Sequence, residues 1–184
     1  MQKNKEKIIL GIDPGTSVMG YGLILVNGQK CRLLQFGVIH LSKYTNHAMK
    51  LKKIFERIIS IIDDFSPDEV ALEAPFYGKN VQSMLKLGRA QGIAMAAALS
   101  REISIVEYAP KMVKKSVTGN GNASKEQVAK MLMKLLNFNE SPKLLDASDA
   151  LAVALCHHYQ RGKPQSATKS WKAFLSENPE RMKK

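Results

Sequence analysis

Cysteine is scarce in this sequence of 184 residues, which contains only Cys31 and Cys156. The two cysteines lie in unrelated segments and form no Cys-x-x-Cys motif. This argues against a zinc site built from closely spaced thiolates and against a fold held together by disulfides. We therefore expect two reduced, buried thiols in a protein of the cytoplasm.

Long hydrophobic segments are also absent. Residues 1–7 are polar and the apolar run after them is only as long as a strand, so we expect no signal peptide. The longest apolar helix face, Gly92–Leu99, is far too short to cross a bilayer. These features predict a protein without a membrane segment.

Acidic residues are in the minority, with 16 Asp and Glu against 28 Lys and Arg and a formal net charge of +12. Such an excess of positive charge favours polyanionic partners and gives a salt-dependent attraction to phosphate backbones. Charge alone does not distinguish a nucleic-acid-binding protein from one that is merely basic, so this distinction depends on the sequence motifs.

The length suits one domain with a substantial core, and the hydropathy pattern alternates between strand and helix periods. Strands are expected at 8–13, 20–26, 31–41, 68–73 and 103–108, and helices at 47–65, 81–101, 125–136 and 146–159, with a short helix from residue 110. Ser124 and Gln127 have the spacing of a capping box at the start of one of these helices.

Short turns connect the first three expected strands. Asn27-Gly28 is a strong signal for a two-residue hairpin, and the third strand should alternate through Leu34, Phe36 and Val38. Right-handed crossovers would place the fourth strand parallel to its neighbours. We predict an α/β fold with a mixed five-stranded sheet, in which strands 1, 2 and 3 form an antiparallel meander, strands 4 and 5 are parallel and helices cover both faces.

The first and fourth strands each end on an acid, Asp13 and Glu73. Pro14 cannot donate a ladder hydrogen bond and Gly15 permits a positive φ, so the chain must turn after Asp13. Asp13 is then either an ordinary turn residue or a functional acid at the rim of the core. If the two strands are neighbours, both acids face one crevice at the carboxyl ends of the strands.

Two further acids, Asp146 and Asp149, open the last expected helix. Residues three apart share a helix face, so both can point to the same spot. The structural alternative is that Asp146 caps the helix and Asp149 is a first-turn acid favoured by the helix dipole.

Four clustered carboxylates would repel one another unless a cation lies between them. All-oxygen ligands favour Mg²⁺, with Mn²⁺ as a substitute, over zinc. His157 and His158 supply no zinc motif, because adjacent helix residues face different directions, and we expect both to be exposed. Acidic ligands on a basic protein predict phosphodiester hydrolysis assisted by two metal ions, without specifying the nucleic acid.

Four segments resemble one known family in residues and in spacing. They read LGIDPGTSVMGYG, EAPFYGKNVQSMLKLGRAQG, EYAPKMVKKSVTGNGNASKEQV and DASDALAVALCHH, in this order between residue 8 and about residue 160. They are similar to RuvC, the bacterial family of Holliday-junction resolvases. The resemblance implies a ribonuclease-H-like fold, a homodimer, the RuvA–RuvB branch-migration complex as a partner, and Mg²⁺-dependent symmetric nicking of four-way DNA junctions in recombination and repair.

The resemblance also implies the roles of individual residues. Some family members carry His where this chain has Asp146. The catalytic and metal-binding acids that it implies are Asp13, Glu73, Asp146 and Asp149.

DNA contacts are implied as well. Phe76 falls where the family has an aromatic residue that stacks on bases near the junction, although it could instead anchor a loop. Lys114 and Lys125 match lysines near the scissile phosphate, although a solvated charge is the commoner fate of a lysine. Lys111 and Lys115 complete a basic rim around them. Further candidates for backbone contact are Lys79, Lys86 and Arg89.

Small residues and a basic terminus complete the inventory. Gly88 and Gly92, with nearby alanines, indicate either tight packing of their helix on the sheet or a dimer interface. We expect a nuclease domain over residues 1–162 and a basic, loosely ordered tail over 163–184.

Three other functions fit parts of the pattern. A sugar-kinase or Hsp70-like ATPase shares the Gly-Ile-Asp-x-Gly-Thr phosphate loop, but needs a second such domain. A junction-binding protein without activity would not need all four acids. A ribonuclease-H-like nuclease acting on RNA is disfavoured by the DASDAL segment and by the segment containing Phe76.

Overall fold

The computed structural model describes residues 6–75, 80–138 and 145–161. Strands and helices follow one another much as the hydropathy pattern predicts. The strands are β1 (Lys7–Asp13), β2 (Val18–Asn27), β3 (Lys30–His40), β4 (Glu69–Glu73) and β5 (Ser104–Tyr108), and the helices are α1 (His47–Phe65), α2 (Val81–Leu99), α3 (Pro110–Thr118), α4 (Lys125–Leu135) and α5 (Leu145–Gln160).

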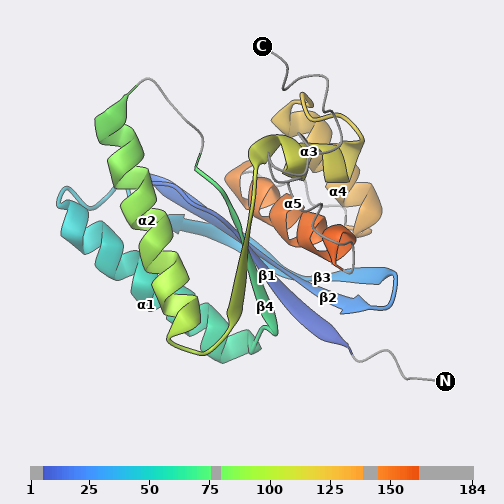
Figure 1. Cartoon of the computed structure of the whole chain (residues 1–184), viewed down its shortest axis with the longest axis horizontal. Coiled ribbons are helices and arrows are strands. Elements are labelled where there is room, and N and C mark those ends of the chain that lie inside the picture. Colours follow the sequence, from blue (N-terminus) through green and yellow to red (C-terminus); the bar gives the residue numbers. More distant parts are fainter. Residues whose placement is uncertain (1–5, 76–79, 139–144, 162–184) are drawn as a thin grey trace, which may run out of the picture.

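The five strands form one sheet in the order β3-β2-β1-β4-β5 (Figure 1). β1 pairs antiparallel with β2, and β2 with β3, whereas β4 pairs parallel with both β1 and β5. The predicted fold class is therefore confirmed. β4 lies beside β1, which is the condition under which Asp13 and Glu73 face one crevice.

The β2–β3 hairpin differs in two details from the sequence prediction. Asn27 pairs with Lys30, so the two turn residues are Gly28 and Gln29, one position later than expected. Gly28 has a φ of 60°, which suits a glycine at the first central position of a type II′ turn. The expected alternation in β3 is also wrong, because a bulge leaves Leu34 unpaired and turns it to the face opposite Phe36.

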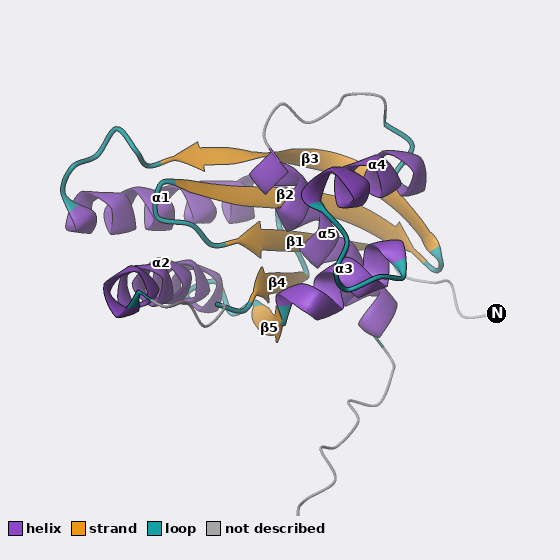
Figure 2. Cartoon of the chain, turned by 90° about the horizontal axis from the view of Figure 1, so that it is seen from above, coloured by secondary structure: helices purple, strands orange, loops and turns teal. Residues whose placement is uncertain are grey.

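Two hydrophobic clusters lie on the two faces of the sheet. Helices α1 and α2 cover one face, and α5 covers the other with α3 and α4 packed on it (Figure 2). α1 has its buried isoleucines at three- and four-residue intervals, as an amphipathic helix requires. It ends at Phe65, and its C-cap residue Ser66, just before Pro67, has a left-handed φ of 46°.

Helix α5 lies unusually close to the sheet because glycines line its path. A Cβ on Gly20 would stand 2.0 Å from the carbonyl oxygen of Asp146, and one on Gly11 would stand 2.1 Å from the carbonyl oxygen of Ala150. Any other residue would push the helix away, so these glycines determine the distance between α5 and the strands.

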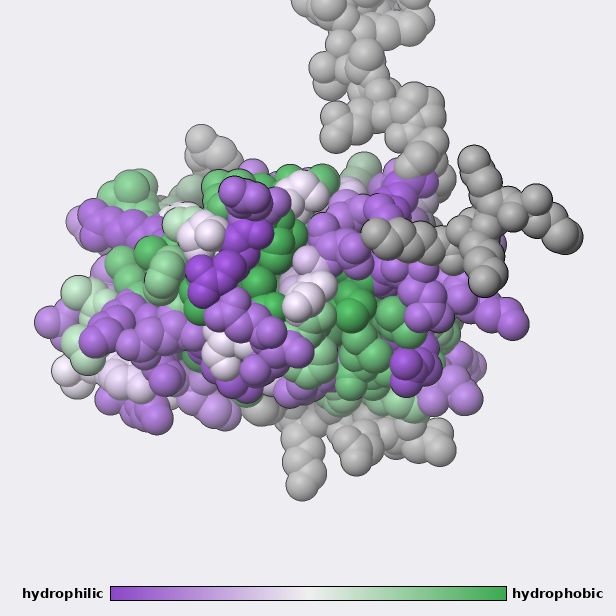
Figure 3. Space-filling view, turned by 90° about the horizontal axis from the view of Figure 1, so that it is seen from below, coloured by the Kyte–Doolittle hydropathy of each residue, from purple (hydrophilic) through white to green (hydrophobic). Residues whose placement is uncertain are grey.

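Figure 3 shows the molecule from the side opposite to that of Figure 2, and hydrophilic and hydrophobic side chains lie next to one another on this surface.

Among the described residues, no helix has the length and apolar character that crossing a membrane requires. Neither cysteine forms a disulfide; Cys156 is buried and Cys31 is half-buried. The predicted tail over 163–184 lies outside the described residues, so the division at residue 162 stays a prediction.

Candidate active site

Asp13 and Glu73 lie at the carboxyl ends of the neighbouring strands β1 and β4, on the face covered by α5. Together with Leu87 of α2, they line a cavity of about 130 Å³. The turn after Asp13 forms as predicted, but Gly15 does not adopt a positive φ. Glycine is required at this position for a steric reason instead, because a Cβ would lie 1.7 Å from the carbonyl oxygen of Val18.

Helix α5 brings the other two acids to the same place. It begins at Leu145, so Asp146 is a first-turn residue and not the cap. One carboxylate oxygen each of Asp13, Asp146 and Asp149 lies within 4.8 Å of the others. Glu73 stands beside this group, close enough for the charge of Asp149 to act on it.

The carboxylates of the two strands are held in an unfavourable environment. Burial raises the pKa of Asp13 well above its usual value, and the negative charges of Glu73, Asp149 and Asp146 raise it further. Burial and the charge of Asp149 raise the pKa of Glu73 to about 7, although Lys125 and Lys114 act in the opposite direction. The cluster therefore lacks positive charge.

Lys125 supplies part of the missing charge. Its Nζ lies 2.5 Å from Oδ2 of Asp149 and 3.3 Å from Oδ1 of Asp146. Burial alone would lower the pKa of Lys125, but the two aspartates outweigh it and raise that pKa. The lysine starts α4, whose amino end is held by the predicted capping box between Ser124 and Gln127.

The geometry of these carboxylates fits a divalent cation. Three oxygens within 4.8 Å of one another can surround one ion at the short bond lengths of Mg²⁺ or Mn²⁺. All the donors are oxygen, which does not suit zinc. The raised pKa values of Asp13 and Glu73 indicate carboxylates that a nearby cation would stabilise in their charged form.

The predicted DNA-contacting lysines lie on the α3–α4 side of the acids. Lys114 is half-buried and its charge reaches Glu73. Lys111 and Lys115 are exposed on α3, and the loop at Gly121 packs against the backbone of Lys111. Phe76 lies outside the described residues, as does Lys79.

Gln91 is a residue of this region that sequence reasoning missed. It is only 5% exposed, and its Nε2 donates a short hydrogen bond to Oε1 of Glu107 and lies 3.5 Å from the carbonyl oxygen of Glu73. It therefore ties α2 to the ends of β4 and β5. The sequence signal that could have identified Gln91 is a polar residue on the side of α2 that otherwise carries the small buried residues Ala90 and Ala94.

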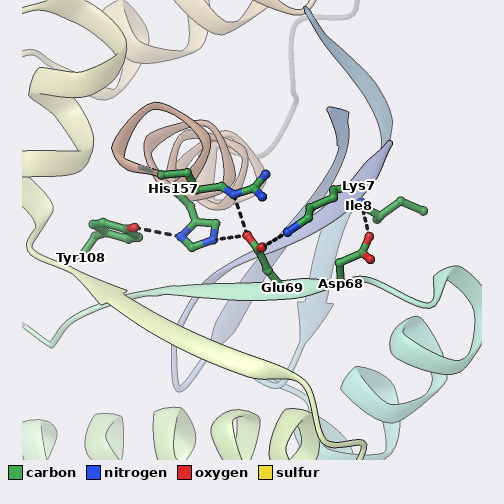
Figure 4. Close-up of polar contacts among 7 residues, drawn as sticks. Lys7, Ile8, Asp68, Glu69, Tyr108 and His157 are labelled. Carbon is green, nitrogen blue, oxygen red and sulfur yellow. Dashed lines mark hydrogen bonds and ion pairs between the residues drawn. The ribbon is translucent and has the colours of Figure 1, made fainter. Parts of the chain in front are cut away.

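The expectation that His157 and His158 are exposed is wrong, since they are only 5% and 9% exposed. The side chains differ in direction, but α5 is buried almost all round because the sheet, α3 and α4 surround it. His157 Nε2 lies 2.8 Å from Oε2 of Glu69, and its Nδ1 lies 2.8 Å from the hydroxyl of Tyr108 (Figure 4). Neither histidine belongs to the group formed by Asp13, Asp146 and Asp149.

Gly88 and Gly92 do not serve the packing of α2 on its own sheet. Both are exposed, and a Cβ at either position would meet nothing within 4 Å. The alanines behave differently, because Ala90, Ala94 and Ala97 are buried against the sheet. The first of the two readings of these glycines is therefore wrong.

The segment that contains these residues is similar to a known protein family. A family model described as crossover junction endodeoxyribonuclease RuvC matches residues 9–157. The chain belongs to the RuvC family. RuvC of Cytophaga hutchinsonii is 63% identical over 181 residues, covering 98% of this chain and 90% of that protein. RuvC of Bacteroides fragilis is 57% identical over 187 residues, covering 100% of both.

A solved RuvC structure agrees with the fold. Thermus thermophilus RuvC in complex with a Holliday junction substrate has a TM-score of 0.78 and 33% identity to this chain, covering 83% of it and 93% of the other chain. The ribonuclease-H-like expectation for the sheet and helices is thus confirmed by a RuvC with its substrate.

Proposed function

We propose that this chain is a Holliday junction resolvase, a crossover junction endodeoxyribonuclease that makes paired symmetric nicks in four-way DNA junctions during recombination and repair. The observation that carries the proposal is the meeting of Asp13, Asp146 and Asp149, from β1 and α5, with Glu73 of β4 beside them in the cavity that Asp13 also lines. Family membership supports the activity, and the substrate of the Thermus thermophilus relative supports the junction.

Asp13, Glu73, Asp146 and Asp149 would hold Mg²⁺, or Mn²⁺ in its place, with two ions in each active site. Bound ions of this kind supply an activated water and stabilise charge on the leaving 3′-oxygen. The chain contributes rigid placement: the glycine-lined approach of α5 fixes Asp146 against β2, and the turn at Pro14-Gly15 fixes Asp13. Gln91 is a positioning residue for the end of β4.

Lys125 and Lys114 would act on the scissile strand. Their charges already reach the acids, so a phosphate lying on the cluster would meet both ammonium groups. Lys111 and Lys115 would hold the backbone further along α3. Phe76, three residues after Glu73, would stack on bases near the junction.

A homodimer suits a substrate with two equivalent strands, because a two-fold pair supplies two equivalent sites. The exposed face of α2 supports such an interface. It carries the apolar side chains of Val81 and Leu85, which are 67% and 54% exposed, beside the open surface at Gly88 and Gly92. The RuvA–RuvB branch-migration complex is the expected protein partner, and the cytoplasm is the expected compartment.

The deciding experiment compares cleavage of a synthetic four-way junction, a linear duplex and an RNA–DNA hybrid on one gel with Mg²⁺. We expect paired nicks in the junction only. Asp13→Asn should abolish cutting and leave junction binding intact, because one metal ligand is lost while the basic surface stays. Equal cutting of duplex or hybrid would contradict the assignment as a resolvase.

A further inference from the structure

A second group of basic side chains borders the acids on the side of α1 and α2. The charges of three cations act on His47, the first residue of α1: Lys50 one turn along the same helix, and Lys86 and Arg89 of α2. We call these four residues the α1–α2 basic cluster.

The α1–α2 basic cluster is joined directly to the turn that follows Asp13. Lys50 Nζ donates a 3.0 Å hydrogen bond to the carbonyl oxygen of Thr16, three residues after Asp13. On α2, Leu87 lines the cavity shared by Asp13 and Glu73. Lys86 and Arg89, three residues apart, share a different face of the same helix. Lys114 and Lys125 belong to α3 and α4 on the opposite side of the strand ends (Figure 2).

The cluster has no compensating negative charge among the described residues. None of its four members forms an ion pair there, whereas Lys52 and Lys53 of the same helix pair with Glu56. The Nε2 atom of His47 is shielded from solvent and has no hydrogen-bond partner in the described part of the chain. An uncompensated cationic group with an unsatisfied imidazole is suited to an anion.

We infer that the α1–α2 basic cluster binds a backbone phosphate of the junction strand after it leaves the acids, and that His47 takes up a proton when the strand binds. The inference rests on the proposed function. It places DNA across the acidic cluster, from Lys114 and Lys125 on one side to Lys50, Lys86 and Arg89 on the other.

The coupling to pH follows from what surrounds His47. Partial burial and the charges of Arg89, Lys86 and Lys50 lower the pKa of this imidazole, so the free protein holds it neutral at pH 7. A phosphate between these cations would offset their charge and raise the pKa of His47. Binding would then consume a proton, and affinity would rise as the pH falls.

The test uses a metal-free background in which Asp13→Asn and Glu73→Gln remove the titration of the two acids with raised pKa. Junction binding is followed by fluorescence anisotropy between pH 6 and pH 8. In this background affinity should increase toward pH 6, and adding His47→Gln should flatten the profile while changing the affinity at pH 8 less than about twofold.

Lys50→Met should weaken binding about five- to tenfold and lower the slope of log K against log salt by about one. Lys52→Met is the matched control, since Lys52 lies on the same helix but pairs with Glu56, and its effect should be far smaller. Circular dichroism confirms that each variant is folded.

Two results would overturn the inference: an unchanged pH profile in His47→Gln, or equal effects of Lys50→Met and Lys52→Met. In either case wild-type protein that still nicks junctions selectively leaves the proposed function standing. Loss of junction selectivity in the wild type would instead remove the proposed function itself.

Discussion

The two ends of β4 carry the same residue in opposite circumstances. Glu69 begins the strand and Glu73 ends it, four residues apart on the face covered by α5. Burial acts to raise the pKa of Glu69, but hydrogen bonds from Lys7 and His157 and the charge of Arg161 outweigh it and lower that pKa. Glu73 has neighbours of its own sign, and its pKa is raised to about 7.

Figure 4 shows how complete the arrangement around Glu69 is. Lys7 Nζ lies 2.7 Å from one carboxylate oxygen, while Arg161 Nε at 3.1 Å and His157 Nε2 at 2.8 Å meet the other. Burial and two nearby cations lower the pKa of His157, although Glu69 acts against them, so the imidazole donates from Nε2 and accepts from Tyr108 at Nδ1. One end of the strand is stabilised by oppositely charged neighbours, and the other lies at the proposed metal site.

The largest expected effect breaks the Glu73 end. Glu73→Gln should lower junction cleavage about a thousandfold, because it removes one of the four carboxylates proposed to hold the metal ions that stabilise the transition state. Without metal, the Glu73→Gln variant should be no less stable than wild type at pH 7, since the substitution removes a carboxylate whose charged form is disfavoured by burial. Cleavage assays and urea denaturation check the two halves, and a stability loss in Glu73→Gln would contradict the contrast.

The next effect breaks the Glu69 end. Glu69→Gln should lower the free energy of unfolding by about 2–3 kcal/mol, because three partly buried cationic or hydrogen-bonding partners lose their carboxylate. Cleavage by the folded protein should stay within a few-fold of wild type at low temperature. If Glu69→Gln impaired cleavage without changing urea stability, the assignment of this end to stability would fail.

The smallest effect is a difference in pH dependence. The pKa of Glu73 in the folded protein lies above its unfolded value of 4.5. As the pH rises from 4.5 to about 7, the free energy of unfolding of metal-free wild type should therefore fall by about 2 kcal/mol relative to that of Glu73→Gln. Glu69 has the opposite sign, because its folded pKa is lowered. Its contribution is present above pH 4.5 and is lost as the pH falls below that value.

Thermal denaturation of wild type and both variants, in EDTA from pH 4 to pH 8, measures these differences. Adding Mg²⁺ at pH 8 should stabilise wild type more than Glu73→Gln. Parallel curves for the two variants would contradict the comparison.

Much of this arrangement could be predicted from the sequence. Alternation and helix periods identify every strand and helix within a few residues, and right-handed crossovers make β4 parallel to its neighbours. The sequence left open whether β4 lies beside β1. That adjacency brings Asp13 and Glu73 together. The pairing of Asp146 with Asp149 follows from helix geometry.

The remaining features depend on tertiary contacts that local patterns do not encode. His157 was expected at the surface because adjacent helix residues face different directions, yet its partners Glu69 and Tyr108 come from distant strands. Gly15 looked like a residue for a positive φ, but its requirement is the nearby carbonyl of Val18. The bulge at Leu34 likewise depends on how β3 pairs with β2.

The glycine-lined path of α5 has a consequence for how this protein can diverge. The spacing between Asp13 and Asp146 is set by main-chain atoms meeting at Gly11 and Gly20, and not by the shapes of core side chains. Aliphatic residues elsewhere in the core can therefore exchange for one another over long periods of descent without moving the acids. A single methyl group added at Gly20, by contrast, would collide with the carbonyl oxygen of Asp146 and displace this acid.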